Sequence, residues 1–295
     1  MTDWLMEWNP TPFQAIVKPM ESAGSDDVKL CKNIAEVRQH CEYVLGKSNQ
    51  LGLKNMGVLV QEFLEGTEYV VDTVSRDGVS KCVGLWQYHK EAINGHTAPI
   101  VYFGQKTLAI VEGEKDSEKL KSVVEYQKRV LTALNITQGP AHAEIKLVRG
   151  EPCLVEVGSR CHGAEACWRD IYVESHGEGN DQVSAACDSI LDEEKFKRLP
   201  DLPPVHKAFP RVCFIVSYVS GILIEVREDL YKEILGMQSF RNIQLFVENG
   251  KKVMPTTDSF TFVGQVTLCH VDESVVEKDY ERIHEIENNG FLVLE

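Results

Sequence analysis

The sequence predicts an α+β protein with antiparallel sheets, flanking helices and a small mixed lobe at its C-terminal end. Hydrophobic residues make up 43% of the 295 residues and charged residues 26%, as in ordinary globular proteins. Short apolar runs of strand length are interleaved with longer stretches of helical period. Because Asp77-Gly78 and Arg149-Gly150-Glu151 are turn signals between strand-like runs, neighbouring strands are expected to be antiparallel.

Six strands and two helices are predicted in the first 157 residues. The helix over Ser117–Leu134 is predicted from an apolar stripe with a period of about 3.6 residues, and a second helix is expected over Ile34–Leu51. The predicted strands are Gln14–Lys18, Val58–Phe63, Tyr69–Ser75, Lys81–Tyr88, Ala141–Val148 and Pro152–Val157.

A domain boundary is predicted at residues 199–205, because three prolines within this short segment disfavour both helix and central strand. The predicted domains are residues 1–198 and 206–295, and a helical region over Glu165–Leu191 is expected at the end of the first. The second is expected to be a mixed lobe built from Val212–Val219, Gly221–Val226, Asn242–Val247, Thr261–Val271 and a helix over Ser274–Asn288.

Charge and cysteine usage exclude several classes of partner. With 31 basic and 45 acidic residues, the net charge of −14 disfavours nucleic acid and acidic membrane surfaces. The nine cysteines show no C-x-x-C spacing, so reduced thiols in a cytoplasmic protein are expected. Residues 1–8 lack the pattern of a signal peptide, and the most apolar window, Val212–Val226, is too short to span a membrane.

Lys18 closes a buried strand and is followed by the small residues Ser22, Gly24 and Ser25. Such a loop can present backbone N–H groups to phosphate oxygens, with the lysine as a point charge beside them. The competing interpretation is an ordinary turn, and Asp26 and Asp27 argue mildly against an anion site.

A strand-to-strand connector follows at Gln61, Glu62, Phe63 and Leu64. A connector passing over an apolar pocket can offer backbone donors and acceptors to an adenine edge, and Glu68 could then take the ribose hydroxyls. A plain hairpin with solvated acids explains the same residues.

Glu144 and Glu156 carry the strongest local argument. If residues 149–151 form a three-residue loop, the two glutamates lie directly opposite each other on neighbouring strands. Like charges at that spacing are destabilising unless a cation lies between them, and two carboxylates beside phosphate oxygens suit Mg²⁺. A register slip by one residue would instead turn one glutamate to solvent.

Arg160 follows the second glutamate and is suited to neutralising a transferring phosphoryl group or gripping a carboxylate. His142 and His162 have no accompanying zinc pattern, so structural roles are favoured for both. Cys161 and Cys167 are interpreted as core thiols.

The order and spacing of these motifs resemble the ATP-grasp superfamily. The resemblance runs from residue 14 to about 163, through Lys18-Pro19, the small-residue loop, Gln61 to Glu68, Glu144 and Glu156-Val-Gly-Ser-Arg160. Within the superfamily the chain is most similar to the L-amino acid ligase, or carboxylate–amine ligase, branch through Gly139 to Glu144 and Arg160 to Gly163.

The resemblance implies that ATP phosphorylates a carboxylate and that an amine then displaces phosphate to give an amide. It implies that Lys18 and the loop over Ser22, Gly24 and Ser25 contact phosphates, with Lys90 as a further phosphate contact. Gln61, Glu62, Phe63 and Leu64 would hold adenine, Glu68 the ribose, and Glu144 with Glu156 the Mg²⁺, for which Mn²⁺ is an alternative. Arg160 would be catalytic. The implied substrates are ATP, a small carboxylate and an amino-acid-like amine; a homodimer is left open.

The sequence departs from the family pattern in two ways. Gly158 stands where members usually carry an asparagine, and the chain begins just before the strand that ends in Lys18. These departures favour either a fragment of a longer protein or a reduced member without independent activity. The alternative functions are a catalytically weak or inactive nucleotide-binding module and, less favoured, a biotin carboxylase.

Overall fold

The computed structural model describes residues 12–295, so the prediction made for residues 1–8 lies outside the described residues. The described strands form a three-stranded N-terminal sheet, an eight-stranded sheet and a three-stranded C-terminal sheet. Every neighbouring pair of strands is antiparallel. The predicted α+β class with antiparallel sheets is confirmed.

The N-terminal sheet carries one helix. Asn33 caps this helix by accepting a hydrogen bond from the backbone N–H of Glu36, as an N-terminal cap should. The helix packs Val37 and Cys41 against the sheet. The elements are β1 (Ala15–Pro19), β2 (Lys29–Cys31), α2 (Ile34–Val44) and β3 (Val58–Glu62), in the sheet order β2-β1-β3.

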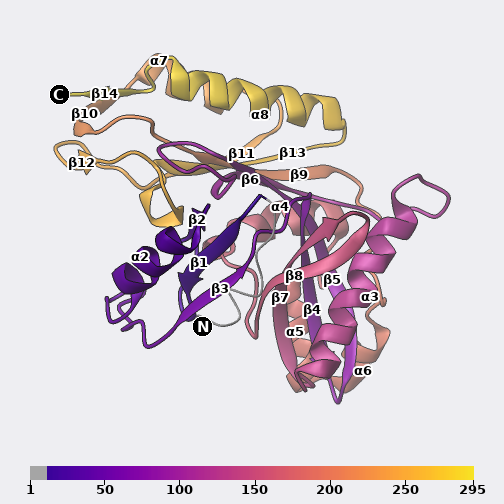
Figure 1. The fold of residues 1–295 in the computed structure, drawn as a ribbon. Coiled ribbons are helices and arrows are strands. Elements are labelled where there is room, and N and C mark those ends of the chain that lie inside the picture. The colour runs from indigo at the N-terminus through magenta and orange to yellow at the C-terminus, as the bar shows by residue number, and fades with distance from the viewer. Residues whose placement is uncertain (1–11) are drawn as a thin grey trace.

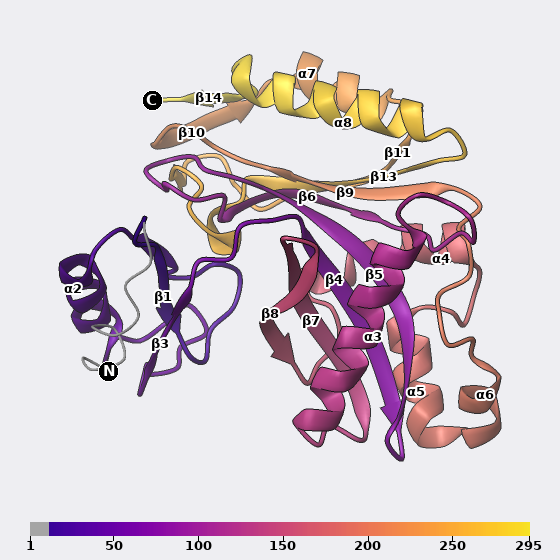
Figure 2. The ribbon, with the colours of Figure 1, turned by 45° about the vertical axis from the view of Figure 1, so that its right-hand side comes forward.

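The eight-stranded sheet forms the centre of the molecule (Figure 2). Its strands are β4 (Glu68–Arg76), β5 (Val79–Glu91), β6 (Val101–Thr107), β7 (Gly139–Val148), β8 (Glu151–Gly158), β9 (Phe209–Ile215), β11 (Phe240–Leu245) and β13 (Gly264–His270). They are ordered β11-β13-β9-β6-β5-β4-β7-β8.

Helices cover both faces of this sheet near β4, so alternate residues of that strand enter two different cores. Tyr69 and Val71 pack in the core formed with α3 (Ser117–Ala133). Val70 packs with Trp168 and Tyr172 of the helix on the other face. The helices of that face are α4 (Trp168–His176), α5 (Gln182–Leu191) and α6 (Glu193–Arg198).

At the C-terminal end, α7 (Glu228–Leu235) and α8 (Glu273–Asn288) pack over β9, β11 and β13 (Figure 1). Beside them lies the third sheet, of order β12-β10-β14. In the part of the chain that the structure describes, no helix has both the length and the apolar character needed to cross a bilayer. The third sheet consists of β10 (Gly221–Val226), β12 (Lys252–Val253) and β14 (Leu292–Leu294).

The eight-stranded sheet continues across the predicted boundary at residues 199–205. β9, from the second predicted domain, pairs with β6 of the first, and Gln105 lies opposite Val212. The division into domains stays a prediction, but the strands on its two sides belong to one sheet.

Two predicted helices are too long. α2 ends at Val44 because the chain turns at Gly46, which has a φ of 80°. The predicted Glu165–Leu191 region is divided into α4 and α5 by Gly177 and Gly179, which have φ values of 89° and 79°. The elements that the sequence did not indicate are β2, β6, α6, α7, β12 and β14.

Candidate active site

A cleft of about 180 Å³ lies between the N-terminal sheet and the strands β4, β5, β6, β7 and β8. It is lined by every residue for which the sequence predicts a nucleotide or metal role, although these residues come from segments far apart in the chain. They are Lys18, Ser22, Gly24, Ser25, Gln61, Glu62, Phe63, Leu64, Glu68, Lys90, Glu144 and Glu156.

Glu144 and Glu156 lie directly opposite each other on β7 and β8. The connecting loop differs from the predicted one, because Val148 pairs with Glu151 and leaves only Arg149 and Gly150 in the turn. Both turn residues have positive φ, 51° and 89°, which suits a two-residue hairpin. A register shift between Ile145 and Glu144 then restores the predicted pairing of the two glutamates.

Cross-strand partners have Cβ atoms about 4.5–5.5 Å apart, so these two carboxylates share one small region of the cleft. Glu144 is buried, whereas the side chain of Glu156 is half-exposed. Burial raises the pKa of the Glu144 carboxyl; Lys90 opposes the shift, and the carboxylates of Glu68 and Glu156 add to it. Opposed carboxylates of this kind fit a divalent cation, which would relieve their repulsion.

Lys90 forms ion pairs with both Glu68 and Glu144, and its Nζ lies 3.5 Å from Glu144 Oε2. Lys146 lies 3.4 Å from the other oxygen of Glu68. Burial alone would raise the pKa of Glu68, but these two ammonium groups outweigh it and hold that pKa below its usual range. The site therefore holds an ionised Glu68 carboxylate beside a Glu144 carboxyl that binds a proton more readily than Glu68 does.

On the opposite wall, Lys18 Nζ lies 2.7 Å from Glu156 Oε2 and thereby joins the N-terminal sheet to the edge of the central sheet. The loop after β1 is held internally, since Ser22 Oγ donates to Asp26 Oδ2 at 2.7 Å. Ser25 Oγ donates to the Ile100 carbonyl at 3.0 Å.

The small residue at position 24 permits a close approach from the C-terminal part of the chain. Gly24 has a φ of 65°, and Ser259 N donates to its carbonyl at 2.9 Å. A Cβ at this position would lie 1.7 Å from Ser259 Oγ. The loop is therefore closed against Ser259 only while residue 24 lacks a side chain.

The connector between β3 and β4 lines the cleft through Phe63 and Leu64. Lys146 Nζ donates to the Leu64 carbonyl at 3.2 Å and lies over the Phe63 ring, 5.5 Å from its centre. Gln61 Nε2 donates to the Val155 carbonyl at 3.4 Å, and its buried Oε1 has no hydrogen-bond partner in the part of the chain that the structure describes. Glu68, predicted for ribose, pairs with the two lysines described above, and its ribose contact stays a prediction.

Arg160 lies outside the first cleft and lines a second cavity of about 380 Å³. The two spaces share Ala23, Gly24, Tyr102, Glu144 and Glu156, so Arg160 lines a space that the same two carboxylates border. Gly158 pairs with His142 at the end of β8.

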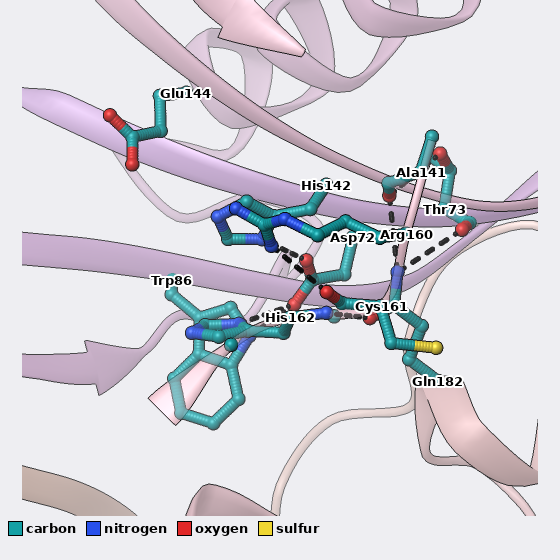
Figure 3. Close-up of polar contacts among 12 residues, drawn as sticks. Asp72, Thr73, Trp86, Ala141, His142, Glu144, Arg160, Cys161, His162 and Gln182 are labelled. Carbon is teal, nitrogen blue, oxygen red and sulfur yellow. Dashed lines mark hydrogen bonds and ion pairs between the residues drawn. The ribbon is translucent and has the colours of Figure 1, made fainter. Parts of the chain in front are cut away.

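Figure 3 shows that Asp72 lies between His142 and His162. Each imidazole has its Nδ1 at 2.8 Å from an Asp72 oxygen, and Trp86 Nε1 donates to the same carboxylate at 2.9 Å. Asp72, His142 and His162 each offer one possible ligand atom, and these atoms lie close enough together to surround a metal ion. Three N–H bonds already satisfy the buried carboxylate, so the arrangement is explained as a hydrogen-bond network.

Sequence reasoning missed several residues that line the two spaces or lie directly behind their walls. Tyr102 donates to Glu144 Oε1 at 3.2 Å, but it lies on β6, a strand that was not predicted. Lys146 could have been found, because it lies two residues after Glu144 on the same strand and alternation puts both on one face. Asp72 carried no local signal for its pairing with two distant histidines.

Residues 11–170 match the family model described as the ATP-grasp domain. The chain belongs to the ATP-grasp family. ATP-grasp domains bind ATP, so the predicted nucleotide-binding class is confirmed at the level of the family. The predicted ATP-grasp fold is confirmed as well.

Among curated proteins, this ATP-grasp chain is 32% identical to dapdiamide A synthase of Enterobacter agglomerans over 292 residues, 97% of the chain and 65% of that protein. Among solved structures it is similar to the L-amino acid ligase from Bacillus licheniformis, with a TM-score of 0.73 and 19% identity, covering 99% of this chain and 65% of that one. Carboxyaminoimidazole ribonucleotide synthase from Aspergillus clavatus, complexed with ATP, gives a TM-score of 0.64 at 13% identity over 98% of this chain and 66% of that one. The chain thus spans about two thirds of the length of these proteins.

Proposed function

We propose that this ATP-grasp chain carries the Mg²⁺-dependent ATP site of a carboxylate–amine ligase. The observation that carries the proposal is the pairing of Glu144 with Glu156, bordered by Lys18 and Lys90 on one side and by Arg160 on the other. Similarity to dapdiamide A synthase and to an L-amino acid ligase fold supports this choice among ATP-grasp reactions.

In the proposed reaction, an oxygen of the substrate carboxylate attacks the γ-phosphorus of ATP and the bond to ADP breaks. The amine nitrogen then attacks the carbonyl carbon of the acyl phosphate, phosphate leaves, and the nitrogen loses a proton. The products are an amide, ADP and phosphate. Glu144 and Glu156 would hold Mg²⁺, which neutralises phosphate charge when bound.

The described residues have separate tasks in this scheme. Lys18 would exchange its contact with Glu156 for a phosphate oxygen, and the loop over Ser22, Gly24 and Ser25 would cover the phosphates. The connector from Gln61 to Leu64 would hold adenine. Arg160 would bind the carboxylate and stabilise charge on the transferred phosphoryl group.

Trapping with hydroxylamine tests the proposal. An acyl phosphate reacts with hydroxylamine to give a hydroxamate, so a panel of carboxylic acids is incubated with Mg²⁺, ATP and hydroxylamine while ADP and hydroxamate are measured. Equal amounts of both products, dependent on the acid, are expected. Mg–ATP binding without any acid-dependent ADP would support an inactive nucleotide-binding module, as Gly158 favours. The cytoplasmic location, the amino-acid-like amine and a homodimer stay predictions.

A further inference from the structure

We propose that the second cavity binds the acid substrate and selects acids with a flat aromatic body that bears a neutral polar group. This inference rests on the proposed function, because it names the substrate class of that site. The cavity, of about 380 Å³, is of the size that holds one small ligand.

Aromatic side chains dominate its walls. Phe214 stacks on Phe262 with ring centres 4.7 Å apart and nearly parallel planes, and Tyr88 meets Tyr102 edge-on at 4.9 Å. Aromatic rings favour such offset and edge-on partners, so a flat ring is the body that these walls suit best. The six aromatic residues that line the cavity are Tyr88, Tyr102, Phe214, Phe246, Phe260 and Phe262.

Two of these aromatic residues are unusually exposed. Phe246 retains 44% of its surface and Phe260 46%, although both belong to the cavity lining. Burying an exposed phenylalanine ring is favourable in proportion to the apolar area that it removes from water. A ligand with an apolar body would cover this surface, whereas a small polar acid would leave it in water.

The sheet fixes the direction in which the acid would lie. Glu144 and Glu156 border both the nucleotide cleft and the cavity, and Arg160 lines the cavity beside them. Within residues 12–295, the Arg160 guanidinium donates only one hydrogen bond, from Nη1 to the adjacent Cys161 carbonyl at 2.9 Å. The carboxylate is therefore expected at Arg160, with the body extending across β6, β9 and β13 toward Gln105 and Phe214.

Gln105 supplies the polar contact for that body. It is 2% exposed and lines the cavity, and its Oε1 lies 3.0 Å from His162 Nε2. Its Nε2 is buried without a partner among the described residues. A buried polar group without a hydrogen bond is destabilising, and rotating the amide would only exchange which atom lacks a partner. A hydroxyl on the substrate satisfies either orientation, because it can donate or accept.

The test compares hydroxyphenylpropanoate, phenylpropanoate, propanoate and succinate in the hydroxylamine assay. Both aromatic acids are expected to exceed propanoate and succinate in kcat/KM by about tenfold or more, the size of discrimination that an apolar pocket supplies. Phe246→Ser should reduce that preference. Leu235→Ser, which removes a similarly exposed apolar side chain (43%) of α7 outside the cavity, should not. Gln105→Leu should remove the preference for hydroxyphenylpropanoate over phenylpropanoate.

A measurement of acid binding without nucleotide distinguishes a failure of this inference from a failure of the proposed function. Saturation-transfer NMR with hydroxyphenylpropanoate, without nucleotide, should detect contact in the wild type and in Leu235→Ser, and weaker contact in Phe246→Ser. Equal binding in Phe246→Ser and Leu235→Ser, or a preference for propanoate or succinate over the aromatic acids, would overturn the inference alone. Failure of Mg–ATP to bind would overturn the proposed function, while the NMR comparison would still decide what the cavity accepts.

Discussion

The ammonium of Lys18 lies 2.7 Å from the carboxylate of Glu156 across the cleft between the N-terminal sheet and the central sheet. The two side chains differ in exposure, 11% for Lys18 and 45% for Glu156. A pair with one partner in water contributes little to stability. Its importance is positional, because it holds the lysine proposed to bind phosphate against a carboxylate proposed to bind the cation.

Lys18→Met is therefore expected to weaken ATP binding much more than it destabilises the fold. Loss of a hydrogen bond to a charged group is worth about 1.5–3 kcal/mol, which corresponds to about tenfold or more in affinity. The free energy of unfolding should fall by less than about 1 kcal/mol. Calorimetric titration and urea denaturation measure the two quantities. A large loss of stability with normal ATP affinity would make Lys18 structural.

Lys90→Met should destabilise the fold more than it weakens ATP binding, since Lys90 is buried between Glu68 and Glu144. Removing one partner from a buried charge cluster costs about 3–5 kcal/mol, and protonation of Glu144 should keep the loss near the lower value. Adding Glu68→Gln should recover part of it, because one buried charge is removed. Lys121→Met, from an exposed pair on α3, is the control and should change stability by less than about 0.5 kcal/mol. Similar denaturation midpoints for the variants at Lys90 and Lys121 would refute this account.

Gly24→Ala is expected to open the loop after β1, which is proposed to cover the phosphates, because the added Cβ would lie 1.7 Å from Ser259 Oγ. Gly52→Ala is the matched control: its φ of 77° is also positive, but nothing lies within 4 Å of the added atom. ATP affinity should fall only in Gly24→Ala, and Ser259→Gly in the same chain should restore most of it. Unchanged affinity in Gly24→Ala would show that closure against Ser259 does not contribute to nucleotide binding.

His176 predicts a dependence of stability on pH. Burial lowers its pKa to about 4, and the ring stacks on Tyr172 with centres 3.9 Å apart. Below the ordinary histidine pKa of about 6.5 the unfolded chain binds a proton that the folded chain does not, so stability falls as pH drops from about 6.5 to 4. His176→Phe retains a stacked ring without the titrating group and should flatten the dependence in that window. Equal slopes for the two proteins in denaturation series would contradict the assignment.

The sequence was sufficient for those parts of the site that depend on local pattern. Strand alternation and a hairpin turn brought Glu144 opposite Glu156, although the turn is shorter than predicted and a bulge corrects the register. β6 was not predicted, so Tyr102 and Gln105 could not be placed. The contact of Asp72 with His162 joins residues 90 positions apart, and no periodicity in one sequence encodes such a distance.

The central claim is that Glu144 and Glu156 hold the cation that accompanies ATP. Calorimetric titration of ATP with and without Mg²⁺ tests it most directly, in the wild type, in Glu156→Gln and in the control Glu151→Gln, whose exposed side chain begins β8 outside both spaces. Mg²⁺ should tighten ATP binding about tenfold or more in the wild type and in Glu151→Gln, and it should have little effect in Glu156→Gln while the melting temperature stays near that of the wild type. The same Mg²⁺ enhancement in Glu156→Gln as in the control would contradict the account.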